Sequence, residues 1–277
     1  MFRTMGQMDS TINVTKMMSN LTLDTIGEAA FGFNFKALEN DKSEWRQKVH
    51  DDLTRYLELM DNLIESKRRK IRQGETDCIM EDHEKNLLQL LIEGEEKEGT
   101  LTNEELKSNF CLFFSAGHDS SANSLSFILY YLATHQDIQH KAREEVIRIL
   151  GDEPTDVLPT IANMKEMTYL TMIMKESMRL SGSVPVVFPR RLQEDTDICG
   201  IFISKGTLVS VDMHGMHRNP HVWHNPEKFD PERFAPGGEA EEKGKMAWIP
   251  FSNGERQCIG KNFSMMQQRV VLSMLRK

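Results

Sequence analysis

Five residues of chemically specific types fall within ten positions near the end of the sequence. They are Phe251, Gly254, Arg256, Cys258 and Gly260, in the pattern F-x-x-G-x-R-x-C-x-G. The segment from about Gly260 onward is expected to be helical, and the free N–H groups and dipole of a helix N-terminus favour an anion placed just before it. The pattern therefore indicates a cysteine that ionises and ligates a metal as a thiolate. The alternative is a buried structural cysteine on a glycine-rich turn.

The other four residues of the pattern suit a flat, metal-bearing macrocycle. Gly254 and Gly260 allow tight turns and close approach of the backbone, Arg256 offers a cation to an anionic propionate, and Phe251 shields the sulfur from water. This segment resembles the proximal loop of haem-thiolate proteins. The resemblance implies haem as the cofactor and Cys258 as its iron ligand, and a thiolate ligand donates electron density to iron and favours O–O cleavage.

Composition excludes several other classes of protein. The 277 residues could form one large domain or two ordinary ones, and the net charge of −8 argues against a nucleic-acid partner. Cys78, Cys111, Cys199 and Cys258 show no paired spacing, which argues against a disulfide framework or a zinc site and implies a reducing compartment. No apolar run approaches the ~20 residues of a membrane span, so the chain is expected to be soluble or peripheral.

Hydrophobic periodicity predicts a mainly α-helical protein with a small β-sheet region. A Thr102–Glu105 capping box should open a long central helix that runs to about His135. The other expected helices cover 10–31, 42–72, 137–150, 165–181 and the segment after Gly260. Short β-rich runs between Pro185 and Met213, broken at Gly200 and Gly206, predict the sheet, and a proline-rich, irregular stretch follows it.

Two weak motifs gain meaning from their order. Glu176 and Arg179 form E-x-x-R on one helix face, and Pro231–Phe234 reads P-E-R-F, before the cysteine pattern. Together these resemble the cytochrome P-450 superfamily. The resemblance implies an incomplete P-450 fold in which residues 1–277 form a single domain, from about helix E of that family into the helix after Cys258.

The resemblance also implies roles for particular residues. Glu176 and Arg179 should join Arg233 in a buried charged network that holds the haem loop against the helical core. Arg190 or Arg191 matches the position that meets a haem propionate, and Arg190 is favoured.

The central helix carries the motif that this family places on the oxygen side of the haem. In it, Ala116 should adjoin the haem, Gly117 should leave room for dioxygen, and Asp119 with Ser120 should relay protons to it. Ser120 stands where threonine is usual. The implied reaction inserts one oxygen atom of O2 into a small apolar substrate, with electrons from a separate NADPH-dependent reductase, and the absence of a G-x-G-x-x-G fingerprint fits an external electron source.

Other departures from the family leave alternatives open. The membrane anchor, the substrate lid and the terminal hairpin of the family are expected to be missing, whereas a complete homologue would lie at the cytoplasmic face of the endoplasmic reticulum membrane. The alternatives to a monooxygenase are a haem-thiolate isomerase or dehydratase and a non-catalytic remnant.

Three groups of residues are expected to have ordinary structural roles. The basic cluster Lys67–Lys70 with Arg72 should be a solvated helix end, and most of the 18 methionines and the phenylalanines of the central helix should be core. Six histidines are expected to be solvated or capping residues and not a metal cluster: His135, His140, His214, His217, His221 and His224.

Overall fold

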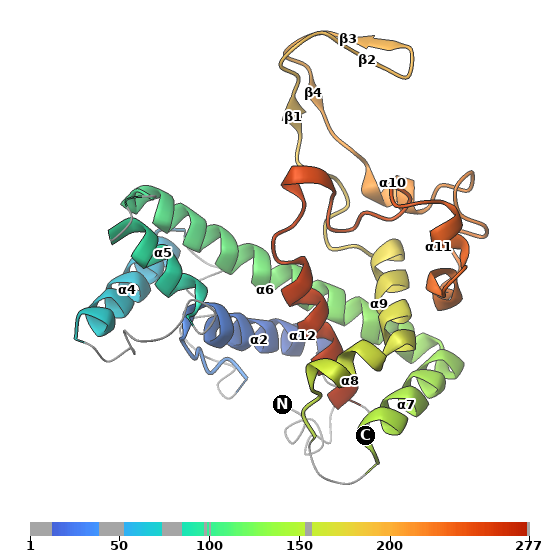
Figure 1. Cartoon of the computed structure of the whole chain (residues 1–277), viewed down its shortest axis with the longest axis horizontal. Helices are drawn as coiled ribbons and strands as arrows, with labels where there is room; N and C mark the ends of the chain where they lie inside the picture. The colour runs from blue at the N-terminus through green and yellow to red at the C-terminus, as the bar shows by residue number, and fades with distance from the viewer. Residues whose placement is uncertain are drawn as a thin grey trace. The chain divides into compact units, whose positions relative to one another are not determined.

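The computed structural model describes residues 13–38, 53–73, 85–96, 99, 101–152 and 157–275 (Figure 1). The chain divides into two compact units, Met1–Asn123 and Ser124–Lys277, and the division falls within the long central helix α6 (Asn103–Thr134). Helices dominate both units, and the strands are short. The prediction of a mainly α protein with a small β-sheet region is confirmed.

The first unit contains α2 (Val14–Ile26), α4 (Leu53–Arg72), α5 (Leu87–Glu96) and the first part of α6. A single π-helical turn, η1 (Gly27–Phe31), continues α2 and ends at Gly32, whose φ of 64° is left-handed and suits glycine. The predicted helix over 10–31 is therefore found from residue 14, and the predicted helix over 42–72 from residue 53. Residues 10–12 and 42–52 lie outside the described residues, and α5 was not anticipated.

Aromatic side chains form the centre of the first unit. The rings of Phe31 and Phe110 lie 4.7 Å apart between centroids, and those of Phe35 and Phe114 lie 5.3 Å apart. All four side chains are buried. The expectation that phenylalanines of the central helix are core holds for Phe110 and Phe114, whereas Phe127 is exposed.

The capping box that was predicted to open the central helix is present. The backbone N–H of Glu105 donates to Thr102 Oγ1 at 3.2 Å, and the N–H of Thr102 donates to the Glu105 carboxylate at 2.8 Å. These bonds lower the pKa of Glu105. The helix runs to Thr134, one residue short of the predicted end.

The second unit contains the second part of α6 and six further helices among its described residues. They are α7 (Gln136–Leu150), α8 (Ile161–Glu166), α9 (Thr168–Leu180), α10 (Met213–His217), α11 (Glu239–Glu242) and α12 (Lys261–Met274). Two 3-10 turns, η2 (Pro231–Phe234) and η3 (Gly254–Arg256), lie in the irregular stretch. No helix in the described part of the chain is both long and apolar enough to cross a bilayer.

The sheet region consists of two antiparallel two-stranded sheets. Strand β1 (Arg190–Arg191) pairs with β4 (Leu208–Val209), and β2 (Thr196–Ile198) pairs with β3 (Ile201–Ile203). Gly200 and Gly206 both have positive φ at the turns where the sequence predicted breaks.

The helix expected over 165–181 is found as α9, but it begins at Thr168, because the chain breaks at Met167 between α8 and α9. Glu145 of α7 accepts the backbone N–H of Tyr169 at 2.8 Å and of Leu170 at 2.9 Å, and Thr168 Oγ1 at 3.1 Å. The free N–H groups of the first turn of α9 are thus satisfied by a carboxylate from another helix. Because its first turn is capped by Glu145, α9 starts as a helix separate from α8.

Candidate functional site

The cysteine loop, residues 251–260, is a closed turn that presents Cys258 just before α12. The backbone N–H of Cys258 donates to the Phe251 carbonyl at 2.8 Å, and the N–H of Gln257 donates to Gly254 at 3.1 Å. Gly254 has a φ of 73°, so a side chain there would strain the turn. Gly260 has a φ of −80°, so the turn itself does not require glycine at that position.

The thiol of Cys258 is free and exposed. The alternative of a buried structural cysteine is therefore wrong. The N-cap of α12 is Gly260, which has no side chain to satisfy the first backbone N–H groups of the helix.

The base of the cysteine loop is attached to two helices of the second unit. Trp248 Nε1 donates to the Lys175 carbonyl of α9 at 3.1 Å. The backbone N–H of Ile249 donates to His217 Nε2 of α10 at 3.0 Å, and both residues are buried. Because both anchors lie just before the loop, they fix where it leaves the helical core.

The three residues that the sequence grouped into one network meet inside the second unit. Arg179 Nε and Nη2 donate to the two carboxylate oxygens of Glu176 at 2.7 and 2.9 Å, which is a bidentate pair. Both side chains are 0% exposed. Arg233 Nε lies 3.4 Å from Glu176 Oε1, so a second guanidinium faces the same carboxylate.

The Glu176–Arg179 pair also holds three backbone groups, one at the end of α10 and two in the irregular stretch that follows it. Arg179 donates to the carbonyls of His217 at 2.8 Å and Lys228 at 3.2 Å, and the N–H of Asp230 donates to Glu176 at 2.9 Å. The stretch after α10 is thereby fixed against α9 by polar bonds.

Burial and partner charge oppose each other at Glu176. Burial raises the pKa of its carboxyl, whereas the bonds from Arg179, the Asp230 amide and the charge of Arg233 act in the opposite direction. Arg233 has further partners, since it pairs with Glu239 and donates to the Asn225 carbonyl at 2.8 Å. Removing either member of the Glu176–Arg179 pair would leave a buried charge without its main partner.

The two adjacent arginines of β1 differ in their contacts. Arg191 donates to the Gly206 carbonyl at 3.0 Å. Arg190 is exposed and has no hydrogen-bond or ion-pair partner among the described residues, and the same is true of Arg256 in the cysteine loop. Arg190 and Arg256 therefore remain available for an anionic ligand, which favours Arg190 over Arg191 as the propionate contact.

The residues of the second unit fit one face of a haem. The exposed thiol supplies the donor that thiolate-ligated iron needs, and apolar side chains follow it in sequence. Ile259 is 83% exposed and Phe263 and Met266 are also exposed, which is apolar area that a macrocycle could cover. Cations for the propionates are present in Arg190 and Arg256.

The oxygen-side residues lie in the first unit, on α6. Gly117 packs against α2, because a Cβ added there would lie 2.1 Å from Ile26 Cδ1. Ser120 Oγ donates to the Ala116 carbonyl at 2.6 Å, which is the usual bond of a helical serine to the residue four positions back. These contacts are local to α2 and α6, and the expected roles of Ala116, Gly117 and Ser120 toward oxygen stay predictions.

Asp119 is exposed and pairs with the neighbouring His118, with 3.0 Å between Asp119 Oδ1 and His118 Nδ1. His118 is buried, and its Nε2 lies 2.9 Å from the carbonyl of Ser19 on α2. Sequence reasoning gave His118 no role, although its place inside the oxygen-side motif was a signal. It connects the predicted proton donor Asp119 to α2.

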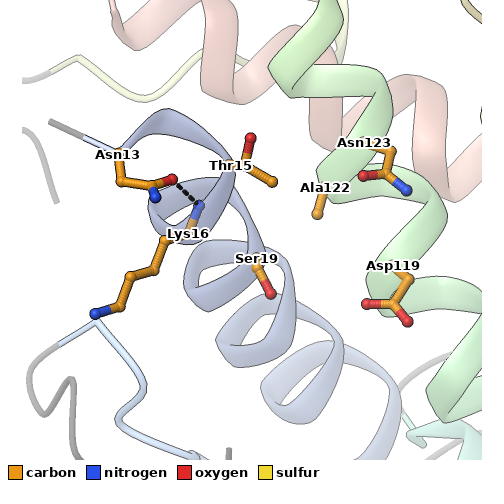
Figure 2. A pocket seen from close by; sticks show the side chains of 7 residues that line it. All are labelled: Asn13, Thr15, Lys16, Ser19, Asp119, Ala122 and Asn123. Atoms are coloured by element: carbon orange, nitrogen blue, oxygen red, sulfur yellow. Dashed lines mark hydrogen bonds between the residues drawn. The ribbon is translucent and has the colours of Figure 1, made fainter. Parts of the chain in front are cut away.

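A hollow of about 330 Å³ lies beside Asp119 (Figure 2). Its wall includes Asn13, Lys16 and Ser19 of the α2 region and Ala122 and Asn123 of α6.

Two of the expectations about polar clusters are wrong at one residue each, His217 and Lys67. His217 is 3% exposed, and burial, followed by the charges of Arg179 and His214, lowers its pKa to about 4. Lys67 is also buried, which lowers its pKa. Amphipathic spacing alone could not distinguish these two side chains from solvated ones. No group of three metal-ligating side chains occurs in the described ranges.

Comparison with known proteins gives a consistent result. The sequence profile described as "Cytochrome P450" matches residues 42–276. The chain is 35% identical over 219 residues to cytochrome P450 4A7 of Oryctolagus cuniculus, which covers 78% of this chain and 42% of that protein. It is 34% identical over 229 residues to taurochenodeoxycholic 6 alpha-hydroxylase of Sus scrofa, covering 82% and 43%.

A longer alignment extends the similarity across almost the whole sequence. The chain is 31% identical over 300 residues to cytochrome P450 4A6 of Oryctolagus cuniculus, covering 96% of this chain and 58% of that protein. The chain spans about half the length of the curated relatives it matches.

The matched profile includes the E-x-x-R pair, the P-E-R-F turn and the cysteine loop, and the structure places these three segments in one unit. The cofactor of the matched family is thiolate-ligated haem. The chain belongs to the cytochrome P450 family.

Proposed function

We propose that the protein containing this chain is a haem-thiolate monooxygenase that inserts one oxygen atom of O2 into an apolar organic substrate. The observation that carries the proposal is the cysteine loop, in which an exposed Cys258 precedes α12 and is held by anchors on α9 and α10. Because the chain belongs to the cytochrome P450 family, we assign this loop the role of binding haem iron through the thiolate.

The chain's own residues would have separate roles in this reaction. Cys258 would ligate the iron, and Arg190 and Arg256 would bind the propionates. Haem, when bound, supplies the activation of O2. On α6, Ala116 would adjoin the haem, Gly117 would leave room for dioxygen, and Asp119 and Ser120 would hold and pass protons.

Electrons would come from a separate NADPH-dependent reductase, as membership of the cytochrome P450 family implies. Location at the endoplasmic reticulum membrane is part of the same proposal for a complete homologue. One relative is named as a hydroxylase, taurochenodeoxycholic 6 alpha-hydroxylase, which supports insertion of oxygen into an organic substrate.

The test is the absorbance spectrum of the haem-reconstituted, reduced protein under carbon monoxide. We expect the long-wavelength Soret band of a thiolate-ligated haem, and its loss in Cys258→Ser, because a serine hydroxyl stays protonated where a thiol ionises. Cys199→Ser is the matched control, since Cys199 is an exposed free cysteine in the turn between β2 and β3 and should leave the band unchanged. A thiolate band that survives Cys258→Ser would overturn the ligand assignment.

The two alternatives give different results in the same preparation. A non-catalytic remnant would show no thiolate-haem spectrum at all. A haem-thiolate isomerase or dehydratase would show the spectrum but would convert an oxidised substrate without consuming NADPH. Asp119 and Ser120 favour the monooxygenase, because only that reaction needs protons delivered to O2.

A further inference from the structure

His217 connects the buried charged pair of α9 to the base of the cysteine loop. Its Nε2 lies 3.0 Å from the backbone nitrogen of Ile249, and its own carbonyl accepts from Arg179 Nη1 at 2.8 Å. Ile249 precedes Phe251 by two residues, and its carbonyl accepts the N–H of Ser252 at 2.9 Å. One residue therefore bonds the Glu176–Arg179 pair on one side and the first turn of the loop on the other.

The direction of the bond to Ile249 fixes the protonation state of the imidazole. A backbone N–H can only donate, so His217 Nε2 must accept. A protonated imidazole carries N–H on both nitrogens and has no acceptor, so the observed bond requires a neutral ring with its proton on Nδ1.

The surroundings of His217 favour that neutral form. Arg179 donates to its carbonyl from α9, Glu176 is bonded to that arginine, and His214 lies on its own helix. The segment packed on its other side contributes Ile249 and Pro250, which carry no charge. Burial is the first cause of a pKa lowered to about 4, and the electrostatic effects of Arg179 and His214 are the next.

We propose that His217 is a positioning residue for the cysteine loop, whose neutral imidazole fixes Ile249 and couples the loop to the Glu176–Arg179 pair. Protonation removes the acceptor, brings a second cation beside Arg179 and releases the Ile249 amide. The consequence for an iron ligand rests on the proposed function, whereas the anchor itself does not.

The first experiment determines the tautomer in the full chain by 15N NMR with selectively labelled histidine. We expect the His217 signals at pH 7 to show a protonated Nδ1 and an unprotonated Nε2, with a titration midpoint near 4. His217→Gln identifies the signals by their disappearance. A protonated Nε2 at pH 7, or a midpoint close to 6.5, would overturn the proposal.

The second experiment measures amide hydrogen exchange in three variants without haem. His217→Gln keeps an acceptor for the Ile249 amide, His217→Leu removes it, and His214→Gln is the control on the exposed side of the same helix. We expect exchange at Ile249 and in the cysteine loop to be roughly fivefold to tenfold faster in His217→Leu, relative to the middle of α12, and unchanged in the other two. An equal increase in the loop and in α12 would mean general destabilisation and would refute a positioning role.

A pH series gives a test that does not depend on the leucine variant folding. After correction for the intrinsic pH dependence of exchange, the wild-type loop should lose protection between pH 6.5 and pH 4, and the His217→Gln loop should not. Equal profiles for the two proteins would refute the proposal. Because none of these measurements uses haem, an absent thiolate-haem spectrum would reject the proposed function and leave the His217 anchor standing.

Discussion

Single residues on α6 have local contacts that explain their types without any cofactor. Gly117 is the point of closest approach to α2, and Ser120 bonds the carbonyl one turn back. Both residues also occupy positions for which the family resemblance implies roles toward dioxygen. Substitutions test whether Gly117 is needed for its contact with Ile26. They also test whether the Ser120 hydroxyl delivers protons or only bonds the Ala116 carbonyl.

Gly117→Ala should destabilise the first unit although alanine is the better helix former. Alanine gains about 1 kcal/mol in helix propensity, whereas the added methyl group must displace buried Ile26, and overpacking costs typically 1–3 kcal/mol. Ile26→Val removes the clashing Cδ1 atom, so the double mutant should be more stable than the sum of the two single changes predicts. Urea unfolding of the four proteins measures this coupling, and strict additivity would mean that Gly117 and Ile26 do not clash.

Ser120 is tested through the fate of oxygen in the haem-loaded protein with its reductase. Ser120→Ala should release more peroxide per product formed, because no hydroxyl remains to deliver a proton. Ser120→Thr should release less, since the added methyl restricts the hydroxyl to fewer rotamers. Equal peroxide-to-product ratios in all three proteins would show that the hydroxyl serves only the Ala116 carbonyl.

At the scale of elements, α9 is the helix on which the second unit is organised. It receives its N-terminal cap from α7, holds the stretch after α10 through the Glu176–Arg179 pair, and contacts Trp248 through the Lys175 carbonyl. The pair is buried, so its contribution depends on both members being present.

Glu176→Ala and Arg179→Ala should each lower the free energy of unfolding by about 3–5 kcal/mol, because each leaves a buried charge uncompensated. The double mutant should lose much less than the sum. The matched control is the exposed pair Asp61–Lys107, whose removal should change stability by about 1 kcal/mol or less. Additive losses at Glu176 and Arg179 in a double-mutant cycle would mean that the two residues do not act as one network.

The stability of the whole molecule should depend on pH through His217. The pKa of a histidine side chain is ordinarily 6.5, and that of His217 in the folded protein is about 4. Between pH 4 and pH 6.5 the unfolded chain therefore binds more protons than the folded protein. The stability contribution of the neutral ring is fully present above pH 6.5 and is lost as pH falls toward 4, with a total of about 3 kcal/mol at most. The pKa of Glu176 is raised in the folded protein. Its effect on the free energy of unfolding is therefore opposite, because stability falls as the pH rises above the ordinary pKa of a glutamate.

The difference between wild type and His217→Gln isolates this contribution, because Glu176 is present in both. Tryptophan fluorescence is a suitable probe, since Trp223 and Trp248 both lie in the second unit. The difference in unfolding free energy should shrink as pH falls from 6.5 to 4. A difference that is constant with pH would mean that His217 titrates equally in the folded and unfolded states.

Local sequence patterns predicted several helix ends, the turns and the cysteine loop. The capping box at Thr102, the end of the first helix at Gly32 and the breaks at Gly200 and Gly206 depend on residues close in sequence, and the structure has them where predicted. The cysteine pattern is also local, because its glycine, arginine and thiol are positions of one loop. These features follow from short-range hydrogen bonds and backbone geometry, which the sequence records directly.

Tertiary structure alone decided which polar side chains are buried and what they hold. Glu145 caps α9 from α7, Gly117 packs on Ile26, and His217 receives an amide from Ile249, across separations of 24, 91 and 32 residues. No periodicity specifies such partners, because a histidine or carboxylate in an amphipathic helix has the same spacing whether it meets water or a distant backbone group. Burial then sets the protonation state, as it does for the neutral imidazole of His217 at the base of the cysteine loop.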